Sequence, residues 1–311
     1  MKPLHTALAL LTVSIWGFNF VVIRWGLAEI PPLLMGVLRF ALAAFPLMLF
    51  YRLPRTHWRA VGAYAAVQFG VQFACLYSAM ALGMPAGLTS LVIQCQALFT
   101  VVLVAGWLRE PVRPLQWLGL GVALAGMAYA GWHVTGGGVG GASGGLDAVP
   151  IPAFLLVVLA GAGWAAGNVQ LRRMNTVLKL APLPPLALMA WASAAAVPPL
   201  LALSLSVEGW QSTVHALSTA SWRGWGAAFF QAYGNTLLGY GVWSWLIGLY
   251  GAARVAPYSL LVPVVGMSSA AWFLGETLDA WKLITFAAVI LGLGLNQWGA
   301  SAGAKAAPFK G

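Results

Sequence analysis

The chain has 311 residues, of which 61% are hydrophobic and only 7% are charged, and its mean hydropathy is +0.85. So few charges cannot coat a water-soluble globule of this size, which excludes that class of protein. The formal net charge of +10 does not indicate nucleic-acid binding, because the basic residues form short clusters between apolar runs rather than one long stripe. We expect these clusters to bind the headgroups of membrane lipid.

The apolar runs have the lengths of transmembrane helices. A helix needs about 20 residues to cross about 30 Å of hydrocarbon, and runs that are apolar on every face lack the alternation of barrel strands. The uncharged stretch Ala60–Leu108 holds two spans, divided by the turn Gly83–Gly87. In chain order, the predicted spans are Pro3–Ile23, Pro31–Tyr51, the two within Ala60–Leu108, Pro114–Val134, Val149–Leu171, Pro182–Leu205, Trp225–Leu249, Pro257–Leu274 and Trp281–Gln297.

These ten spans predict an all-α integral membrane protein made of two inverted repeats. The segment Leu108-Arg109-Glu110 with the later Gly126 matches Leu274-Gly275-Glu276 with Gly292. Because each repeat has an odd number of spans, the second enters the membrane from the opposite side, a plan common in secondary transporters. The predicted boundaries are 1–135 for the first five-helix repeat, 136–148 for a glycine-rich periplasmic connector, 149–300 for the second five-helix repeat and 301–311 for a flexible cytoplasmic tail.

The loops predict the orientation, because Lys and Arg concentrate on the cytoplasmic side of membrane proteins. With the N-terminus inside, only Arg24, Arg223 and Lys282 fall on the outer side. We therefore expect a multi-pass protein of a bacterial inner membrane with both termini in the cytoplasm. The first apolar run is longer than a signal-peptide core, so it is expected to be a retained helix.

Several motifs resemble a known family, the drug/metabolite transporter superfamily in its EamA-like branch of ten-helix carriers. They are Trp16-Gly-x-Asn19, Leu38-Arg-Phe40 and the two Leu-x-Glu segments with their trailing glycines. The closest resemblance in kind is to the aromatic amino-acid exporters of that branch. Family members often carry a proline where Ala97 aligns with Pro263, so a break in the fourth span is left open. Gln94 and Gln96 occupy that neighbourhood instead.

Polar and aromatic side chains in mid-span are the candidates for a solute site. Polar groups are costly in lipid and tend to face a cavity or the interior of the bundle, and an apolar cavity with a few polar groups suits an amphipathic solute. The alternatives are interhelical amide hydrogen bonds and core packing. The predicted substrate-binding residues are Trp16, Asn19, Gln72, Tyr77, Gln94, Trp164, Asn168, Gln231, Asn235 and Tyr258.

Other polar residues are interpreted as structural. Arg39 is expected to snorkel outward or to bind backbone carbonyls, and Glu110 and Glu276 are expected to act as hinges or caps at helix ends. Cys75 and Cys95 lie inside apolar spans, where packing is the expected role. The sequence shows no catalytic constellation, no metal-ligand spacing and no cofactor motif, so we expect neither an enzyme nor a cofactor.

The predicted function is a secondary transporter that exports amino acids, aromatic and other neutral ones, or similar small amphipathic metabolites by alternating access. The substrate follows from the resemblance and from the neutral, aromatic-rich set of candidates. Carboxylates and histidines are absent from mid-span, which predicts facilitated diffusion or weak coupling to protons. The chain is expected to act as a monomer. The alternatives are a broad drug/metabolite carrier of the same fold, a channel and a lipid flippase.

Overall fold

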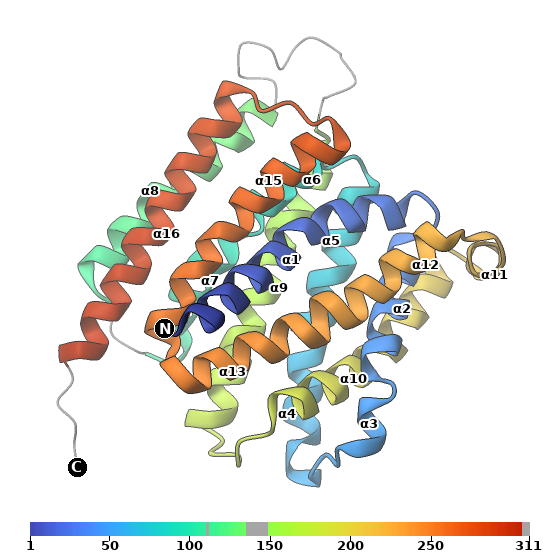
Figure 1. Ribbon diagram of the computed structural model, residues 1–311, viewed down its shortest axis with the longest axis horizontal. Helices are drawn as coiled ribbons and strands as arrows, with labels where there is room; N and C mark the ends of the chain where they lie inside the picture. Colours follow the sequence, from blue (N-terminus) through green and yellow to red (C-terminus); the bar gives the residue numbers. More distant parts are fainter. Residues whose placement is uncertain (110–111, 135–148, 307–311) are drawn as a thin grey trace.

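The computed structural model describes residues 1–109, 112–134 and 149–306, and the regular elements within these ranges are all helical (Figure 1). The predicted connector 136–148, Glu110 and residues 307–311 lie outside the described residues. In the described part, 8 helical stretches are long and apolar enough to cross a membrane. The prediction of an all-α, multi-pass membrane protein is therefore confirmed.

The helices follow the predicted order. The first half contains α1 (Pro3–Leu27), α2 (Pro32–Ala44), α3 (Leu47–Phe50), η1 (Arg55–His57), α4 (Trp58–Ala65), η2 (Ala66–Val71), α5 (Gln72–Ala81), α6 (Ala86–Val92), α7 (Cys95–Trp107) and α8 (Pro114–Val134). The second half contains α9 (Ile151–Thr176), α10 (Pro185–Val207), α11 (Trp210–Thr219), α12 (Trp222–Phe229), η3 (Phe230–Gly239), α13 (Tyr240–Tyr250), α14 (Ala252–Val255), η4 (Ala256–Leu260), α15 (Leu261–Leu274) and α16 (Ala280–Ala306).

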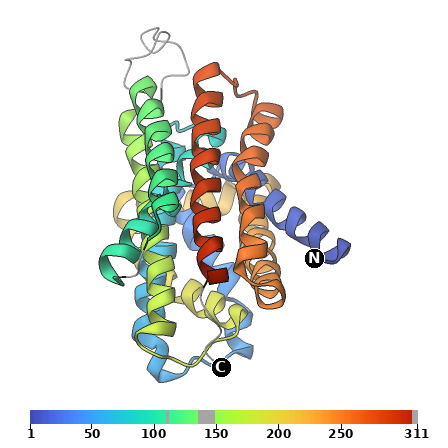
Figure 2. The same cartoon turned by 90° about the vertical axis from the view of Figure 1, so that its left-hand side faces the viewer.

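We number the spans in chain order as α1, α2–α3, η1–α5, α6–α7, α8, α9, α10, α12–α13, α14–α15 and α16. Spans five and eight are not among these 8 stretches. Glycine, glutamine and histidine lower the hydropathy of α8, and amide and glycine residues do the same for span eight. Both nevertheless pack within the bundle, α8 along α16 and span eight along α1 (Figures 1 and 2).

The spans of the two halves interlock in a pattern that repeats. Span one packs against spans eight and nine, and span six packs against spans three and four. Span two packs against span seven, and span five packs against span ten. These contacts are unchanged when each span is replaced by the span five places away, as a pseudo-two-fold axis between the halves would require.

Glycines allow spans five and ten to approach closely. A Cβ added to Gly119 would overlap the carbonyl oxygen of Gly292, and one added to Gly292 would lie 2.7 Å from the Cβ of Ala123. A Cβ added to Gly126 would likewise lie 2.7 Å from the Cβ of Ala288. Nothing lies within 4 Å of a Cβ added to Gly121. Small residues at helix contacts are typical of membrane bundles, where packing rather than hydrophobic burial favours association.

Irregular turns interrupt paired spans. Span three contains the π-helix η2, and its partner, span eight, contains the longer π-helix η3. Span four is broken at Ile93 and Gln94, where the N–H of Ala97 bonds to the carbonyl of Gln94 at 3.0 Å. The sequence did not decide whether span four is broken. The structure shows the break, although no proline causes it. π-helical turns are rare and frequently mark functional sites.

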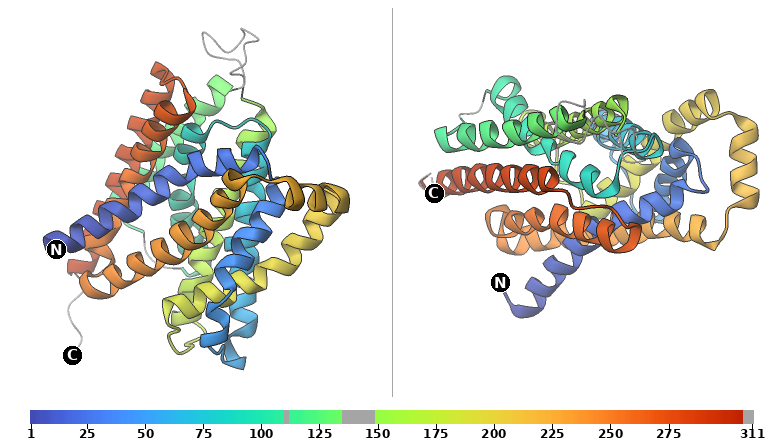
Figure 3. Two further views of the ribbon diagram at one scale, coloured as in Figure 1. Left: turned by 45° about the vertical axis from the view of Figure 1, so that its right-hand side comes forward. Right: turned by 90° about the horizontal axis from the view of Figure 1, so that it is seen from above.

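Two elements differ from the predicted boundaries. The sequence predicts no element between spans seven and eight, yet α11 forms there at the edge of the bundle, at the opposite end from both termini (Figure 3). The predicted flexible tail begins at residue 301, whereas α16 continues through Ala306. Alanine and lysine favour helix, so this polar and alanine-rich end extends the tenth span.

Candidate functional site

A buried cation lies where α2 meets spans three and eight. The side chain of Arg39 is 1% exposed, its Nε donates to Oγ1 of Thr236 at 3.0 Å and its Nη1 donates to the hydroxyl of Tyr77 at 3.0 Å. The guanidinium carbon lies 4.2 Å from the ring centre of Phe73. The prediction that Arg39 snorkels or binds backbone carbonyls is wrong, because hydroxyl groups of the facing spans reach it inside the bundle.

The hydrogen bonds of Arg39 continue into η3. The Tyr77 hydroxyl donates to Oε1 of Gln231, and Oγ1 of Thr236 donates to the backbone carbonyl of Gln231 at 2.8 Å. Arg39, Tyr77, Gln231 and Thr236 thus form a closed polar ring across α2, α5 and η3. We call these four residues the polar ring.

An aromatic wall adjoins the polar ring. The indole Nε1 of Trp16 on α1 donates to the backbone carbonyl of Asn235 at 3.2 Å, and the Trp16 ring lies 5.3 Å from that of Tyr240 and 5.0 Å from that of Trp243. A Cβ on Gly239 would lie 2.5 Å from the Trp16 Nε1, so glycine is needed there. Aromatic rings beside a polar cluster suit an amphipathic ligand.

Three buried amide groups in this region have no hydrogen-bond partner. They are Nε2 of Gln231, Oδ1 of Asn19 and Oδ1 of Asn235, on residues that are 0%, 5% and 6% exposed. Asn19 shares a helix face with Trp16, three residues earlier on α1. Unpaired buried polar groups cost free energy and are rare in folded proteins, which makes these groups candidates for contacts with a solute.

Half of the predicted substrate-binding residues therefore gather at one place, namely Trp16, Asn19, Tyr77, Gln231 and Asn235. The remaining five lie elsewhere. Gln72 accepts from Nε2 of Gln68 at 2.9 Å, and Asn168 donates to Gln96 at 3.1 Å and to Thr100 at 3.3 Å. These amides line the contacts of α9 with spans three and four. They form hydrogen bonds within the bundle, as in the alternative given for polar residues in mid-span. The sequence missed Arg39 and Thr236 as members of the cluster.

The other predicted residues are spread over three elements. Gln94 is 8% exposed and forms the N-cap of α7 at the break in span four. Trp164 is half-buried on α9 against the main core. Tyr258 in η4 packs beside Leu246 and Val255 in a small satellite cluster. None of the three contacts the polar ring through a hydrogen bond.

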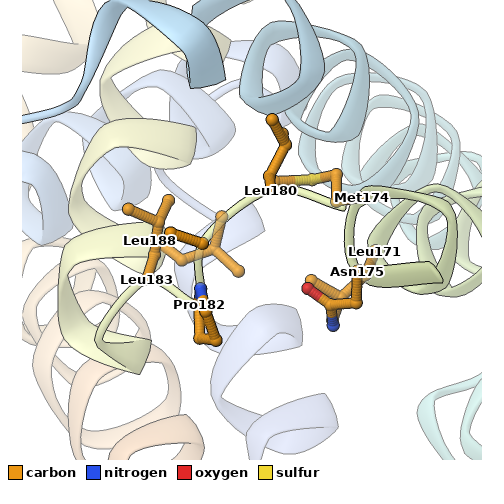
Figure 4. A pocket seen from close by; sticks show the side chains of 8 residues that line it. Leu171, Met174, Asn175, Leu180, Pro182, Leu183 and Leu188 are labelled. Carbon is orange, nitrogen blue, oxygen red and sulfur yellow. The ribbon is translucent and has the colours of Figure 1, made fainter. Parts of the chain in front are cut away.

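A separate cavity of about 100 Å³ lies where α9 leads into α10 (Figure 4). Asn175 and Pro182 line it together with leucine and methionine side chains. The predicted substrate-binding residues do not line it. Ligand pockets are commonly about 300 Å³ or larger, so this cavity is a small packing gap rather than a candidate site.

Three carboxylates join the two halves at one end of the bundle. Glu29 accepts from the Ser221 N–H at 2.6 Å. Glu208 accepts from the N–H groups of Leu33 and Leu34 at 2.6 and 3.0 Å. Glu276 accepts from the N–H groups of Ala86 and Gly87 at 2.6 and 2.9 Å. We call these the carboxylate contacts of Glu29, Glu208 and Glu276.

Each carboxylate contact follows the same rule. The glutamate ends an odd-numbered span and binds the first turn of an even-numbered span in the other half, where the N–H groups are free and the helix dipole favours negative charge. Glu276 was predicted to cap the next helix; it instead caps α6 of the first half. Its repeat partner Glu110 lies outside the described residues. Glu29 and Glu208 were predicted only as loop residues.

The other end of the bundle is joined differently in the described residues. The Tyr250 hydroxyl bonds to Nδ1 of His5 at 2.7 Å, and Nε1 of Trp191 donates to the carbonyl of Tyr51 at 2.8 Å. These contacts involve rings and a backbone oxygen, with no carboxylate. The described residues hold no group of three or more His, Cys, Asp or Glu that could bind a metal.

An all-helical bundle of apolar spans, interlocked about a pseudo-two-fold axis with unpaired polar groups inside, is the architecture of a membrane carrier. Comparison with known families supports this class directly. The model of the EamA-like transporter family matches residues 5–132 and 151–297. The chain belongs to the EamA-like transporter family.

Individual relatives agree with the family. A protein of Salmonella typhimurium named "probable amino-acid metabolite efflux pump" is 38% identical over 300 residues, covering 94% of both chains. A protein of Escherichia coli with the same name is 35% identical over 298 residues, again covering 94% of each. The uncharacterized inner membrane transporter YedA of Escherichia coli is 28% identical over 311 residues, covering 94% of this chain and 92% of YedA.

A solved structure, titled only as the crystal structure of a protein, has the same fold. It superposes with a TM-score of 0.60 at 17% sequence identity and covers 100% of this chain and 99% of its own. At this identity the similarity establishes the fold alone. The recognition of the family from its motifs is confirmed by the family match and by the relatives.

Proposed function

We propose that this transporter exports amino acids, aromatic and other neutral ones, or similar small amphipathic metabolites, and that it binds them between α1, α2, α5 and η3. The observation that carries the proposal is the meeting of Trp16, Asn19, Tyr77, Gln231 and Asn235, with an aromatic wall on one side and unpaired amide groups on the other. The names of the two relatives above 30% identity point to the same class of solute.

The proposed mechanism is alternating access between two inverted five-helix repeats, residues 1–135 and 149–300. The interlocked contacts of the spans favour it. When two inverted repeats exchange their conformations, a state open to one side of the membrane becomes a state open to the other side. The carboxylate contacts of Glu29, Glu208 and Glu276 would hold one end closed while the other end opens. The distribution of basic residues favours a periplasmic position for that closed end, with both termini in the cytoplasm of a bacterium.

The proposed site contains no carboxylate from the described residues, which favours facilitated diffusion or weak proton coupling. The described glutamates all engage helix N-termini at one end. A transporter of this kind needs no cofactor and no catalytic residue, and a monomer holds the complete site. The chemistry of the site therefore supports solute binding rather than a reaction.

Counterflow in proteoliposomes tests the proposal. Liposomes preloaded with a panel of amino acids should accumulate labelled phenylalanine, and the initial rate should saturate with concentration. Asn19→Ala and Asn235→Ala should each raise the half-saturation concentration about fivefold, as expected for one lost hydrogen bond of about 1 kcal/mol. Asn296→Ala is the matched control, because Asn296 lies on α16 with a 3.5 Å contact to the Gln116 carbonyl.

Three outcomes would contradict the proposal. A flux that rises linearly without saturation would indicate a channel. Movement of labelled lipid in the same liposomes, without amino-acid counterflow, would indicate a flippase. Normal transport by both Asn19→Ala and Asn235→Ala would place the solute elsewhere in the bundle, and the amides around α9 would then be the next candidates.

A further inference from the structure

We propose that Arg39 is the carboxylate-binding residue of the solute site, so that the transporter selects solutes that carry a free carboxylate. This inference rests on the proposed function and specifies its substrate class. The carboxylate would bind between the guanidinium group of Arg39 and the Nε2 of Gln231. The remaining part of the solute would lie against the aromatic wall of Trp16 and Tyr240.

Arg39 carries a buried charge with neutral surroundings. Arg39 is 1% exposed, and its partners are the hydroxyls of Thr236 and Tyr77 and the ring of Phe73, all of which are neutral. A buried charge is normally paired with an opposite charge, because removal from water costs several kcal/mol. Inside a membrane protein, an ionisable residue without such a partner indicates a ligand or ion pathway.

The acidic residues that the structure describes have their partners elsewhere. Glu29, Glu208 and Glu276 form the carboxylate contacts at one end of the bundle. Asp279 pairs with Lys282 at 3.0 Å and accepts from Thr277 at 3.0 Å in the last loop. Within the described part of the chain, Arg39 therefore has no carboxylate partner, and a solute is the remaining source of one.

A second free donor belongs to the polar ring. Gln231 is 0% exposed, and its Oε1 accepts from Tyr77, which leaves Nε2 as a donor without a partner. Tyr77 connects this amide to Arg39 through two consecutive hydrogen bonds, so the two donors belong to one ring of contacts. A carboxylate has two acceptor oxygens and no donor, and an arginine beside an amide N–H group matches it in charge and in geometry.

The region also offers acceptors for the ammonium group of an amino acid. Oδ1 of Asn19 and Oδ1 of Asn235 are buried acceptors without partners, and an ammonium group offers three donors. The cationic group thus comes from α2 and the free amide donor from η3, while the free acceptor oxygens come from α1 and η3. A zwitterion would satisfy both sets, although the proposal requires only the carboxylate.

The test compares solutes that share a phenyl ring and differ in whether they carry the carboxylate, the ammonium group or both. Purified wild-type transporter in proteoliposomes would perform counterflow of labelled L-phenylalanine against L-phenylalanine, 3-phenylpropionate, L-phenylalaninamide and phenylethylamine as competitors. The two carboxylates should compete, and the two compounds without a carboxylate should be weaker by about 10- to 100-fold, as a charge-assisted hydrogen bond of about 1.5–3 kcal/mol predicts. Equal competition by all four compounds would overturn the proposal.

Two variants separate recognition from folding. Arg39→Gln should reduce the preference for 3-phenylpropionate over phenylethylamine to less than about threefold. Because Arg39 also bonds Tyr77 and Thr236, this variant is checked for a monodisperse elution profile. Gln231→Glu is the second variant. It places a carboxylate two hydrogen bonds from Arg39, and it should remain folded while losing competition by carboxylates. A folded Gln231→Glu variant with unchanged preference would overturn the proposal.

A comparison with an inorganic anion tests whether the site is specific for carboxylates. Chloride is replaced by methanesulfonate, which carries no carboxylate, at constant ionic strength, and the inhibition constant of 3-phenylpropionate should change by less than about twofold. Competition by chloride at the same concentration as 3-phenylpropionate would indicate a general anion site and overturn the proposal. Absence of counterflow for every amino acid would instead refute the proposed function, and the Arg39 inference with it, which distinguishes the two failures.

Discussion

The Oε2 of Glu276 accepts a hydrogen bond from the backbone N–H of Gly87 at 2.9 Å, and a Cβ on Gly87 would lie 3.0 Å from the same oxygen. The same relationship recurs at the start of α12, where a Cβ on Gly224 would lie 3.0 Å from the Oε2 of Glu29. A glycine in the first turn thus leaves room for a carboxylate from the other half of the chain. These contacts are open to direct tests.

Glu276→Gln should destabilise the protein by about 0.5–2 kcal/mol, the usual contribution of a helix N-cap. The variant keeps the shape of the side chain but loses the charge and one acceptor, so one of the N–H groups of Ala86 and Gly87 is left without its partner. The midpoint of thermal unfolding in detergent measures the effect. Asp279→Asn is the control in the same loop, and it should cost less because Asp279 is 47% exposed. Equal effects would show that Glu276 is an ordinary surface carboxylate.

The contact between Glu29 and Ser221 should depend on pH in a defined direction. Hydrogen bonds from Ser221 hold the pKa of Glu29 below its ordinary value of 4.5. A group whose pKa is lowered by folding stabilises the folded state fully above its unfolded pKa, and this stabilisation is lost as the pH falls through the folded pKa. The difference in unfolding temperature between wild type and Glu29→Gln should therefore be constant above about pH 5 and shrink below it. A difference that grows on acidification would contradict this sign.

Gly292→Ala should disrupt the packing of spans five and ten. The new methyl group would lie 2.5 Å from the backbone oxygen of Gly119, and a backbone atom cannot move aside as a flexible side chain can. Overpacking of this kind costs about 1–3 kcal/mol. Gly294→Ala, two residues later, is the matched control, because nothing lies within 4 Å of its added Cβ. Thermal unfolding of the two variants should separate them clearly, and equal midpoints would argue against close packing.

Tyr77→Phe should weaken both folding and transport. It removes the partner of Arg39 Nη1 and of Gln231 Oε1 at once, and leaving buried polar groups unpaired costs about 1–3 kcal/mol. Tyr233→Phe on span eight is the control, because Tyr233 is 37% exposed. Unfolding midpoints and half-saturation concentrations in counterflow would be measured together. If Tyr77→Phe behaves like Tyr233→Phe, the polar ring does not hold the site.

The positions of most spans could be predicted from the sequence because charge is expensive in lipid, so the few charged residues mark where helices end. The same reasoning failed for Arg39. Its cost is reduced by Tyr77 and Thr236, which lie 38 and 197 residues away in the chain, and no local pattern shows that they meet it. Span eight was predicted from its apolar residues even though its mean hydropathy is lower than that of its neighbours.

Only half of the predicted substrate-binding residues lie at the candidate site, and the cause is related. Amides in mid-span look alike in sequence, yet Gln231 and Asn235 lie beside α1 and α2 while Gln72 and Asn168 line the contacts of α9. Which group faces a solute depends on the interlocked packing of the halves. The carboxylate contacts were missed because each joins a glutamate to N–H groups in the other half. The element α11 was missed because its apolar residues, such as Trp210, are few and widely spaced.

The π-helical turns of η2 and η3 have a consequence for how such a site is encoded. A π turn holds one residue more than an α turn, so it rotates everything that follows by about 100° relative to an uninterrupted helix. Tyr77 follows η2, and Tyr240 follows η3. Deletion of one residue from η2 would keep nearly every side chain in the chain, yet it would direct the Tyr77 hydroxyl away from Arg39. The same deletion in η3 would move the Tyr240 ring away from Trp16. The number of residues in η2 and η3 is thus part of the information that specifies the site, alongside the identity of the residues that form it.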